Sequence, residues 1–300
     1  MKIVIEDLKI KFGKQILVDE KLSNYSWFNL GGPADVLFKP DSIKDIISFL
    51  EKIKPQKFTI LGAGSNTLIR DGGIKGITIK LSSAFSYIRL ESNNIIEVGA
   101  ATSDKKVADF AMENSLTGLE FLACIPGSIG GAIRMNTGCY GDDISQILHS
   151  IEVIDAKGKL KVILAEDINF SYRCSDFEEN LLVTSVKLIG KHSIKQKIAE
   201  KQKTLVEKKK NSQPSQIKTC GSTFKNPKNK NAWELIKESN CDNLRVGDAK
   251  ISEKHCNFFV NNGNATSKDL EELINKVKKT VFQKTKINLE LEIKIIGINK

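Results

Sequence analysis

The glycine-rich stretch from residue 124 to residue 141, CIPGSIGGAIRMNTGCYG, has residue types suited to binding an anion. It holds five glycines, and Pro126-Gly127 is typical of a tight turn. Glycine lets another group approach bare backbone amides, and unpaired amides in a turn form an anion-binding nest. The stretch predicts a phosphate or pyrophosphate site, although a structural loop between two sheets explains the same residues equally well. No Gly-Lys-Ser/Thr follows, so the stretch is not a P-loop.

A second candidate phosphate loop, GAGSNTLIRDGG, follows the apolar run Phe58–Leu61 directly. Gly62 and Gly64 match the first two glycines of the dinucleotide-binding fingerprint, but Thr67 stands where the third glycine belongs. Ser65 and Asn66 add side-chain donors. A strand that feeds directly into these residues favours phosphate binding, and the alternative is a hairpin loop before the next strand.

Length and composition limit the class of protein. A chain of 300 residues suits two or three domains, and its 40% hydrophobic and 27% charged residues are typical of a globular protein. No apolar run is long enough to span a bilayer, and the N-terminus lacks the uncharged core of a signal peptide, so we expect a cytoplasmic protein. The six cysteines form no C-x-x-C and the three histidines are scattered, which predicts free thiols and no metal site.

The basic residues are unevenly distributed. The net charge is +10, and residues 187–230 hold thirteen lysines against two glutamates. Such a segment could bind nucleic acid, but it has no arginine and only Phe224 as an aromatic residue, so a general drift toward lysine explains it better. Where lysine is the default, arginine indicates a need for a planar, bidentate donor. On that ground, Arg134 and Arg245 are candidate anion contacts.

Hydrophobic periodicity and capping residues predict an α+β fold in two unequal halves. We expect helices that begin after Ser42 and Ser103, a charged helix over 193–210, a helix over 232–239 and a long helix capped by Ser267. A hairpin should turn at Lys157-Gly158. The alternation in Leu289–Gly297 places Glu290 and Glu292 on the face opposite the apolar residues. The composition changes near the charged helix, so we place the domain boundary there, with domains at 1–192 and 193–300.

Seven separated motifs, in order and in spacing, resemble the UDP-N-acetylenolpyruvoylglucosamine reductase family. They are NLGGPADVLFKP, LGAGSNTLIRDGG, GLEFLACIPGSIGGAIRMNTGCYG, FSYRCS, GSTFKNP, HCNFFVNNGNATSKDL and LELEIKIIG. The resemblance covers nearly the whole chain after about Ser23. No long insertion follows the FSYR region, so the chain is similar to the shorter subclass of the family.

The resemblance implies a cell-wall flavoenzyme. NADPH would reduce bound FAD, which would reduce UDP-N-acetylglucosamine enolpyruvate to UDP-N-acetylmuramate. The implied fold is an FAD-binding part of the PCMH type, with α+β subdomains at about 1–82 and 83–192, followed by a linker helix and an α+β substrate-binding domain. We expect a monomer that acts on a small-molecule substrate, with no nucleic-acid or membrane partner.

Carried onto this sequence residue by residue, the resemblance implies three groups of site residues. The catalytic residues would be Arg173, Ser222 and Glu292. The FAD contacts would be Gly62, Ala63, Gly64, Ser65, Asn66, Gly127, Ser128, Gly130 and Gly131. The substrate contacts would be Tyr172, Lys210 and Asn226. Without the resemblance, Ser222 is explained as a turn residue, Glu292 as part of a solvated strand face and Arg173 as a surface ion pair.

The sequence departs from the family pattern at cysteines. Cys124 stands where the family usually has glycine, Cys139 where it has alanine, and Cys220 directly precedes the Gly-Ser pair. Thiols near a flavin predict oxidation-sensitive activity. A different flavoprotein of the same FAD-binding superfamily is an alternative. Many of those hold flavin covalently through histidine or cysteine, and neither glycine loop contains histidine. The two C-terminal motifs also favour the reductase.

Overall fold

The computed structural model describes residues 2–53, 57–178 and 180–300, and it divides into two compact units. Unit 1 comprises Met1–Val18, Val36–Ala63 and Gly76–Lys209, and unit 2 comprises Asp19–Asp35, Gly64–Lys75 and Lys210–Lys300. The boundaries between the two units fall inside three strands and one helix, and one further boundary, at Ala63-Gly64, falls between two strands. These elements are β1 (Ile16–Lys21), β2 (Pro33–Phe38), β5 (Ile74–Ile79) and α5 (Lys195–Ser212).

One layer of unit 1 is an antiparallel sheet in the order β12-β11-β15-β7-β6. Its strands are β6 (Ile88–Leu90), β7 (Ile95–Gly99), β11 (Leu148–Ile154), β12 (Leu160–Leu164) and β15 (Leu182–Ile189). The expected hairpin at Lys157-Gly158 is confirmed, because it joins β11 to β12. Helices α3 (Asp104–Glu113) and α4 (Ile129–Arg134) contribute Val107 and Ile133 to the same apolar core as the sheet residues Val98 and Val186.

The Ser103 cap predicted for α3 is also confirmed, since its hydroxyl accepts from the amide of Lys106. The next residue, Asp104, is fully buried, and neither carboxylate oxygen has a hydrogen-bond partner among the described residues. Burial raises the pKa of this carboxyl well above its usual range. Asp104 is therefore a buried acid that favours its protonated form.

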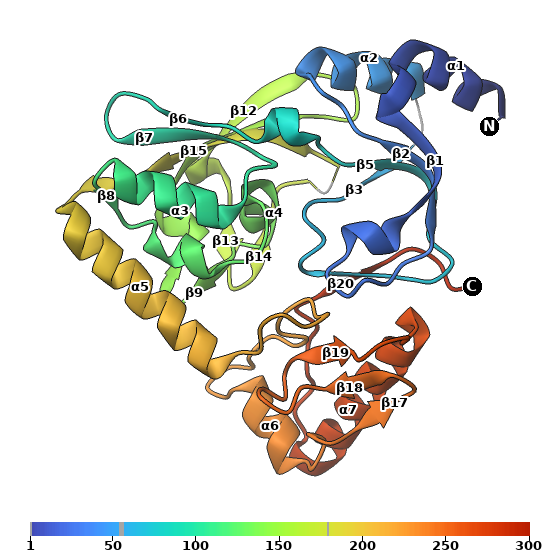
Figure 1. Cartoon of the computed structure of the whole chain (residues 1–300), viewed down its shortest axis with the longest axis vertical. Helices are drawn as coiled ribbons and strands as arrows, with labels where there is room; N and C mark the ends of the chain where they lie inside the picture. Colours follow the sequence, from blue (N-terminus) through green and yellow to red (C-terminus); the bar gives the residue numbers. More distant parts are fainter. Residues whose placement is uncertain (1, 54–56, 179) are drawn as a thin grey trace. The chain divides into compact units, whose positions relative to one another are not determined.

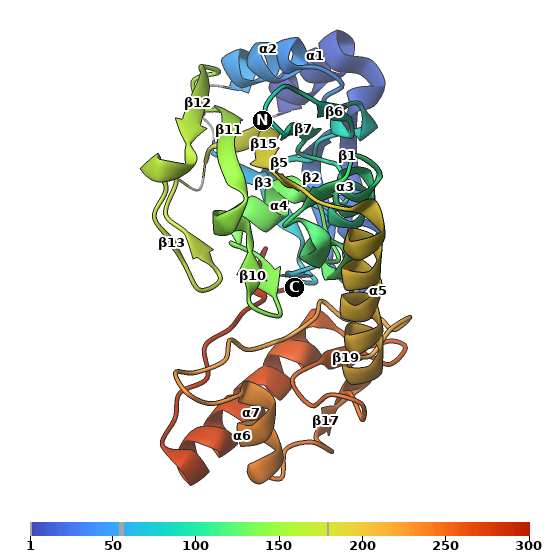
Figure 2. The same cartoon turned by 90° about the vertical axis from the view of Figure 1, so that its left-hand side faces the viewer.

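The second core of unit 1 lies under helices α1 (Lys2–Phe12) and α2 (Ile43–Ile53), which lie side by side (Figure 1; Figure 2). Both helices share this core with β2 and β5. Phe38 stacks on Phe49 at 3.8 Å, and Phe12 packs edge-on against both. Strand β3 (Phe58–Ile60) pairs in parallel with β5, and Ser42 caps α2 as predicted. The N-terminal residues form α1 and β1.

Unit 2 combines a small antiparallel sheet, in the order β17-β18-β19, with two helices. These elements are β17 (Arg245–Val246), β18 (Ala249–Ile251), β19 (Phe259–Asn261), α6 (Ala232–Glu238) and α7 (Ser267–Thr285). A parallel pair, β4 (Thr67–Ile69) with β20 (Lys294–Ile296), joins two distant parts of the sequence. Leu68, Leu235 and Val277 lie in one shared core.

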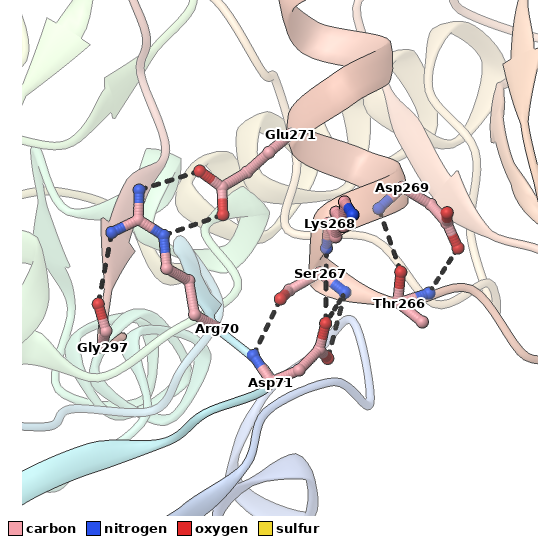
Figure 3. Close-up of polar contacts among 8 residues, drawn as sticks. All are labelled: Arg70, Asp71, Thr266, Ser267, Lys268, Asp269, Glu271 and Gly297. Carbon is pink, nitrogen blue, oxygen red and sulfur yellow. Dashed lines mark hydrogen bonds and ion pairs between the residues drawn. The ribbon is translucent and has the colours of Figure 1, made fainter. Parts of the chain in front are cut away.

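Polar contacts attach the segment after β4 to helix α7 (Figure 3). Arg70 makes a bidentate pair with Glu271, with both N–O distances at 2.8 Å, and donates to the Gly297 carbonyl. The Asp71 carboxylate accepts from the amide of Ser267, and the Ser267 hydroxyl accepts from the amide of Asp71. The predicted Ser267 cap is wrong by one residue. Thr266 caps α7, because its hydroxyl accepts from the amide of Asp269.

The remaining strands all lie in unit 1, and each is two residues long. They are β8 (Leu116–Thr117), β9 (Gly138–Cys139), β10 (Asp142–Asp143), β13 (Phe170–Ser171), β14 (Cys174–Ser175) and β16 (Lys191–His192). They form the pairs β10-β9, β13-β14 and β16-β8. Within the described residues, no helix combines the length and hydropathy needed to cross a membrane.

Candidate functional site

The first glycine loop begins where the parallel strands β3 and β5 end. The amine of Lys80, directly after β5, donates to the carbonyl of Gly62 at 2.5 Å. Burial lowers the pKa of Lys80 to about 8, and the nearby Lys39 acts in the same direction. At neutral pH the Lys80 ammonium is still largely protonated. A cation thus lies against the start of the predicted phosphate loop. The loop was predicted from the sequence, but the position of Lys80 was not.

The second glycine loop packs tightly against the segment before α3. The amides of Ile129 and Gly130 donate to the carbonyls of Thr102 and Ala100, at 2.9 and 3.0 Å. A Cβ at Gly130 would lie 3.0 Å from the Cβ of Ala100, so glycine is needed there for packing. These two amides are used within the protein. Among the described residues, the amides of Gly127 and Ser128 have no such partner and are the donors that a ligand could use.

Within unit 1, the two glycine loops meet at the Ser128 hydroxyl. A Cβ at Gly62 would lie 3.5 Å from Ser128 Oγ, and one at Gly131 would lie 3.7 Å from the same atom. Bare backbone from two loops therefore faces a hydroxyl, with the Lys80 ammonium held on Gly62. Amides, a hydroxyl and a cation are the donors that a pyrophosphate requires, so the residues present fit the FAD diphosphate.

Gly64 is needed for a different reason. Its φ is +68°, and a Cβ there would lie 1.9 Å from the Tyr25 carbonyl oxygen. No residue with a side chain fits this position without moving the backbone. The Asn66 side chain nearby donates to the carbonyl of Glu292 at 3.0 Å, which couples the end of this loop to a predicted catalytic segment.

Arg173 lies in the two-residue turn, Tyr172-Arg173, that joins β13 to β14, and its φ is 57°. A positive φ is uncommon for a residue with a long side chain and often accompanies functional sites. Its guanidinium donates to the Gly138 carbonyl at 2.7 Å and lies 5.0 Å from the Tyr172 ring. Tyr172 is 51% exposed, so it borders Arg173 on the solvent side.

The three consecutive lysines at 208–210 have different surroundings. Lys209 donates to the Cys124 carbonyl, and burial lowers its pKa while the charge of Arg173 acts in the same direction. Lys208 lies 4.7 Å from the Tyr140 ring centre. Lys210, the predicted substrate contact, is exposed, and its backbone carbonyl accepts from Lys254 at 2.6 Å. Lys209 lies close enough to Arg173 for the two charges to interact.

Ser222 and Glu292 come from segments that pair within unit 2. The amide of Glu292 donates to the carbonyl of Thr223 at 2.9 Å, and Phe224 forms a bridge with Leu291. The buried Asn257 side chain pairs with both backbone groups of Phe224, at 3.0 and 2.8 Å. The residue after Ser222 is therefore bound to the Glu292 backbone, and the next residue, Phe224, is fixed by the Asn257 side chain.

The alternation predicted for Leu289–Gly297 is seen in burial at Leu289, Glu290 and Ile293, whereas Leu291 and Glu292 are both half-buried, and regular β20 pairing begins only at Lys294. Leu289 and Ile293 are buried, Glu290 is exposed and Glu292 is half-buried. Asn226, a predicted substrate contact, accepts from the amide of Ala232 through its side-chain oxygen and so supports the start of α6.

The two arginines expected to bind anions make other contacts in the structure. Arg134 donates to the carbonyls of Phe177, Glu178 and Leu181 and stacks 3.8 Å from the Phe177 ring. It thereby fixes a loop rather than presenting its donors to an anion. Arg245 is exposed, donates to the Gly247 carbonyl and lies 3.9 Å from Asp248. Because arginine is rare in this chain, the arginines were expected to make bidentate contacts. The structure shows such a contact at Arg70, which pairs with Glu271.

The catalytic candidates divide between the units, with Arg173 in unit 1 and Ser222 and Glu292 in unit 2. Sequence reasoning missed Lys80 and Asn257. Lys80 is one of many lysines, and its only signal is its place at the end of a strand. Asn257 lies within a quoted motif, but nothing local reveals that its partners are 33 residues away.

Comparison with known proteins shows the family. Residues 213–296 match the family model described as the UDP-N-acetylenolpyruvoylglucosamine reductase C-terminal domain, and residues 34–163 match that of an FAD binding domain. The UDP-N-acetylenolpyruvoylglucosamine reductase of Pelagibacter ubique is 45% identical, over 97% of this chain and 99% of that protein. The chain belongs to the UDP-N-acetylenolpyruvoylglucosamine reductase family.

Other similar proteins agree. The reductase of Wolbachia pipientis wMel is 43% identical over 93% of this chain and 95% of that protein. The crystal structure of the Thermus caldophilus reductase superposes with a TM-score of 0.83 at 32% identity, covering 94% of this chain and 98% of that chain. The α+β fold with an FAD-binding part and a C-terminal domain is thereby confirmed, as is an FAD-dependent oxidoreductase.

Proposed function

We propose that this chain reduces UDP-N-acetylglucosamine enolpyruvate to UDP-N-acetylmuramate with NADPH as the electron donor, and that Arg173, Ser222 and Glu292 carry out the chemistry. Membership in the reductase family over nearly the whole chain supports the reaction. The observation that supports the residue roles best is the pairing of the Ser222 segment with the Glu292 segment, which links two motifs 70 residues apart.

The cofactor is held by the two glycine loops. Gly62, Ser128 and Gly131 present bare backbone and one hydroxyl, and Lys80 adds a positive charge. When bound, FAD supplies the redox chemistry by taking a hydride from NADPH and delivering it to the enolpyruvyl group. The other predicted contacts, Ala63, Gly64, Ser65, Asn66, Gly127 and Gly130, complete these loops.

Arg173 stabilises the charge that develops on the substrate. Hydride addition to the enolpyruvyl methylene carbon moves negative charge onto the substrate carboxylate as an enolate. A planar, permanently charged guanidinium binds such a carboxylate through two donors and stabilises the transition state more than the ground state. The Gly138 carbonyl holds Arg173 through one nitrogen, and the fixed hairpin limits its reorganisation.

Ser222 delivers the proton that completes the reaction at the second carbon. A serine hydroxyl is a weak acid, so the proton must go to a strongly basic carbon or be replaced through a hydrogen-bonded neighbour. Glu292 is the candidate for that neighbour, because its backbone is tied to the residue after Ser222. We assign substrate contacts to Tyr172, Lys210 and Asn226, and we expect a cytoplasmic monomer.

The visible spectrum of purified protein under anaerobic conditions tests this function. NADPH should bleach a yellow protein, and UDP-N-acetylglucosamine enolpyruvate should restore the colour. Bleaching without recovery would contradict the substrate, and a colourless protein that takes up no FAD would contradict the cofactor. Gel filtration at several protein concentrations tests the monomer.

A further inference from the structure

Two cysteines from separate segments of unit 1 lie near each other. Cys124 ends the short 3-10 helix Glu120–Cys124, and Cys139 lies on β9 at the start of the β9-β10 hairpin. The Cys139 sulfur lies 3.6 Å from the carbonyl oxygen of Phe121, in the same short helix that Cys124 ends, so the two thiols are neighbours. Cys124 is buried, whereas Cys139 is partly exposed, so a small reagent can reach the pair from the Cys139 side.

The charges around the pair favour a thiolate on Cys124. The neighbouring Cys139 thiol lowers the pKa of Cys124 to about 7, and the Lys209 ammonium, which is bound to the Cys124 carbonyl, acts in the same direction. Cys124 in turn raises the pKa of Cys139, and burial acts in the same direction, so Cys139 keeps its proton. A thiolate is the nucleophilic form of cysteine, and an adjacent cation is typical of reactive thiols.

Cys220, the third cysteine that the sequence placed near the flavin, differs. It is buried beside the carbonyls of Gly64 and Thr67, and burial raises its pKa to about 12. It therefore stays a thiol at neutral pH and is unreactive. The predicted oxidation sensitivity narrows to Cys124 and Cys139.

A change at Cys139 would reach Arg173 directly. Arg173 donates to the carbonyl of Gly138, the residue before Cys139. Gly138 is tightly packed, since a Cβ there would lie 2.3 Å from the Asp142 carbonyl oxygen. Tyr140 and Gly141, which close the hairpin, both have positive φ, at 57° and 97°. The Gly138 carbonyl and the Cys139 nitrogen belong to one planar peptide unit, so a shift of the Cys139 backbone moves the Gly138 carbonyl.

We propose that Cys124 and Cys139 are a modification site for hydroperoxides, at which a reversible disulfide forms and displaces the Gly138 carbonyl that accepts from Arg173. The Cys124 thiolate attacks one oxygen of hydrogen peroxide, the O–O bond breaks and the other oxygen leaves as water after taking a proton from solvent, which balances the proton that Cys124 released when it ionised. The Cys139 sulfur then attacks the resulting sulfenic acid, the S–O bond breaks and a second water leaves with the Cys139 proton. Two thiols and one peroxide give one disulfide and two waters. The effect on Arg173 rests on the function proposed above.

The experiment treats the full-length, FAD-loaded protein with hydrogen peroxide and alkylates the remaining thiols under denaturing conditions. Peptide mass mapping should find a cross-linked peptide that contains Cys124 and Cys139. Turnover should fall by about 100-fold, the cost of misplacing a group that contacts the reacting substrate. FAD should stay bound, and dithiothreitol should restore both thiols and activity.

Cys139→Ala and Cys124→Ala should each remove the cross-link and the reversible loss of activity. Cys174→Ser is the matched control, because Cys174 is exposed and adjacent to Arg173 but is not part of the pair. This control should respond to peroxide as the unmodified protein does. Alkylation of both Cys124 and Cys139 after peroxide would overturn the proposal, as would a cross-link that leaves turnover unchanged. Mass mapping needs no turnover, so its result is independent of the proposed reaction.

Discussion

Arg173 is held through its side chain from a hairpin turn, whereas Ser222 is held through the backbone of its neighbours. The guanidinium depends on the Gly138 carbonyl and on a residue with φ of 57°. Ser222 precedes a segment fixed by Asn257 on one side and by Glu292 on the other. The side chains of Ser222 and Glu292 can thus be changed without loss of the network, whereas the position of Arg173 depends on the side chain itself.

The largest expected effect follows from replacing Arg173. Arg173→Lys keeps the charge but loses the planar pair of donors, so kcat should fall by about 100- to 1,000-fold. Steady-state kinetics measures this, and Arg245→Lys is the matched control because Arg245 is exposed in unit 2. Near-normal kcat in Arg173→Lys would show that a point charge is sufficient.

Asn257→Ala should destabilise the protein by about 2–4 kcal/mol, because it leaves the buried amide and carbonyl of Phe224 without partners. Urea denaturation measures the loss, and kcat should fall as well because the Ser222 segment loosens. Asn262→Ala, at an exposed position five residues away, is the control. Equal stability of the two variants would contradict the claim that Asn257 holds this segment.

Lys80→Met should weaken FAD binding by about tenfold, since it removes a charge-assisted donor beside the diphosphate. Because burial lowers the pKa of Lys80 to about 8, the unmodified protein should bind FAD best below pH 8, where the ammonium is protonated, and less well as pH rises through 8. The variant should lack this pH dependence. Fluorescence titration of FAD into apoprotein measures both effects, with the exposed Lys44→Met as control. A pH profile that is the same in Lys80→Met would exclude Lys80 from the site.

Asp104→Asn should stabilise the protein by about 1–2 kcal/mol at pH 8. The folded-state pKa of Asp104 is raised, so its contribution to stability is present below the unfolded pKa of about 4 and is lost as pH rises through the folded value. Asparagine keeps the shape without the charge, so the advantage of the variant should shrink toward pH 5. Denaturation midpoints at the two pH values measure this. A destabilised variant at pH 8 would mean that the carboxylate has a partner in solution.

Local signals in the sequence predicted the helices and their caps. Contacts with partners far away in the sequence could not be predicted. Ser42 and Ser103 were found because a cap bonds to residues within one turn of the chain. Thr266 and Ser267 were confused because both side chains suit a cap, and only Asp71, which binds the Ser267 amide, distinguishes them. Nothing near Lys80 in the sequence indicates its contact with Gly62, which lies 18 residues away. Arg134 was expected to bind an anion because three carbonyls beyond residue 176 cannot be recognised as its partners from sequence.

The central claim is that Arg173 and Ser222 act on the substrate and not on cofactor reduction. Stopped-flow absorbance under anaerobic conditions can measure the two half-reactions separately in Arg173→Lys and Ser222→Ala. We predict that NADPH bleaches both variants at the rate of the unmodified protein, while recovery of colour with UDP-N-acetylglucosamine enolpyruvate slows by about 100-fold or more. Equal slowing of bleaching and recovery would contradict the assignment and would place these residues at the cofactor.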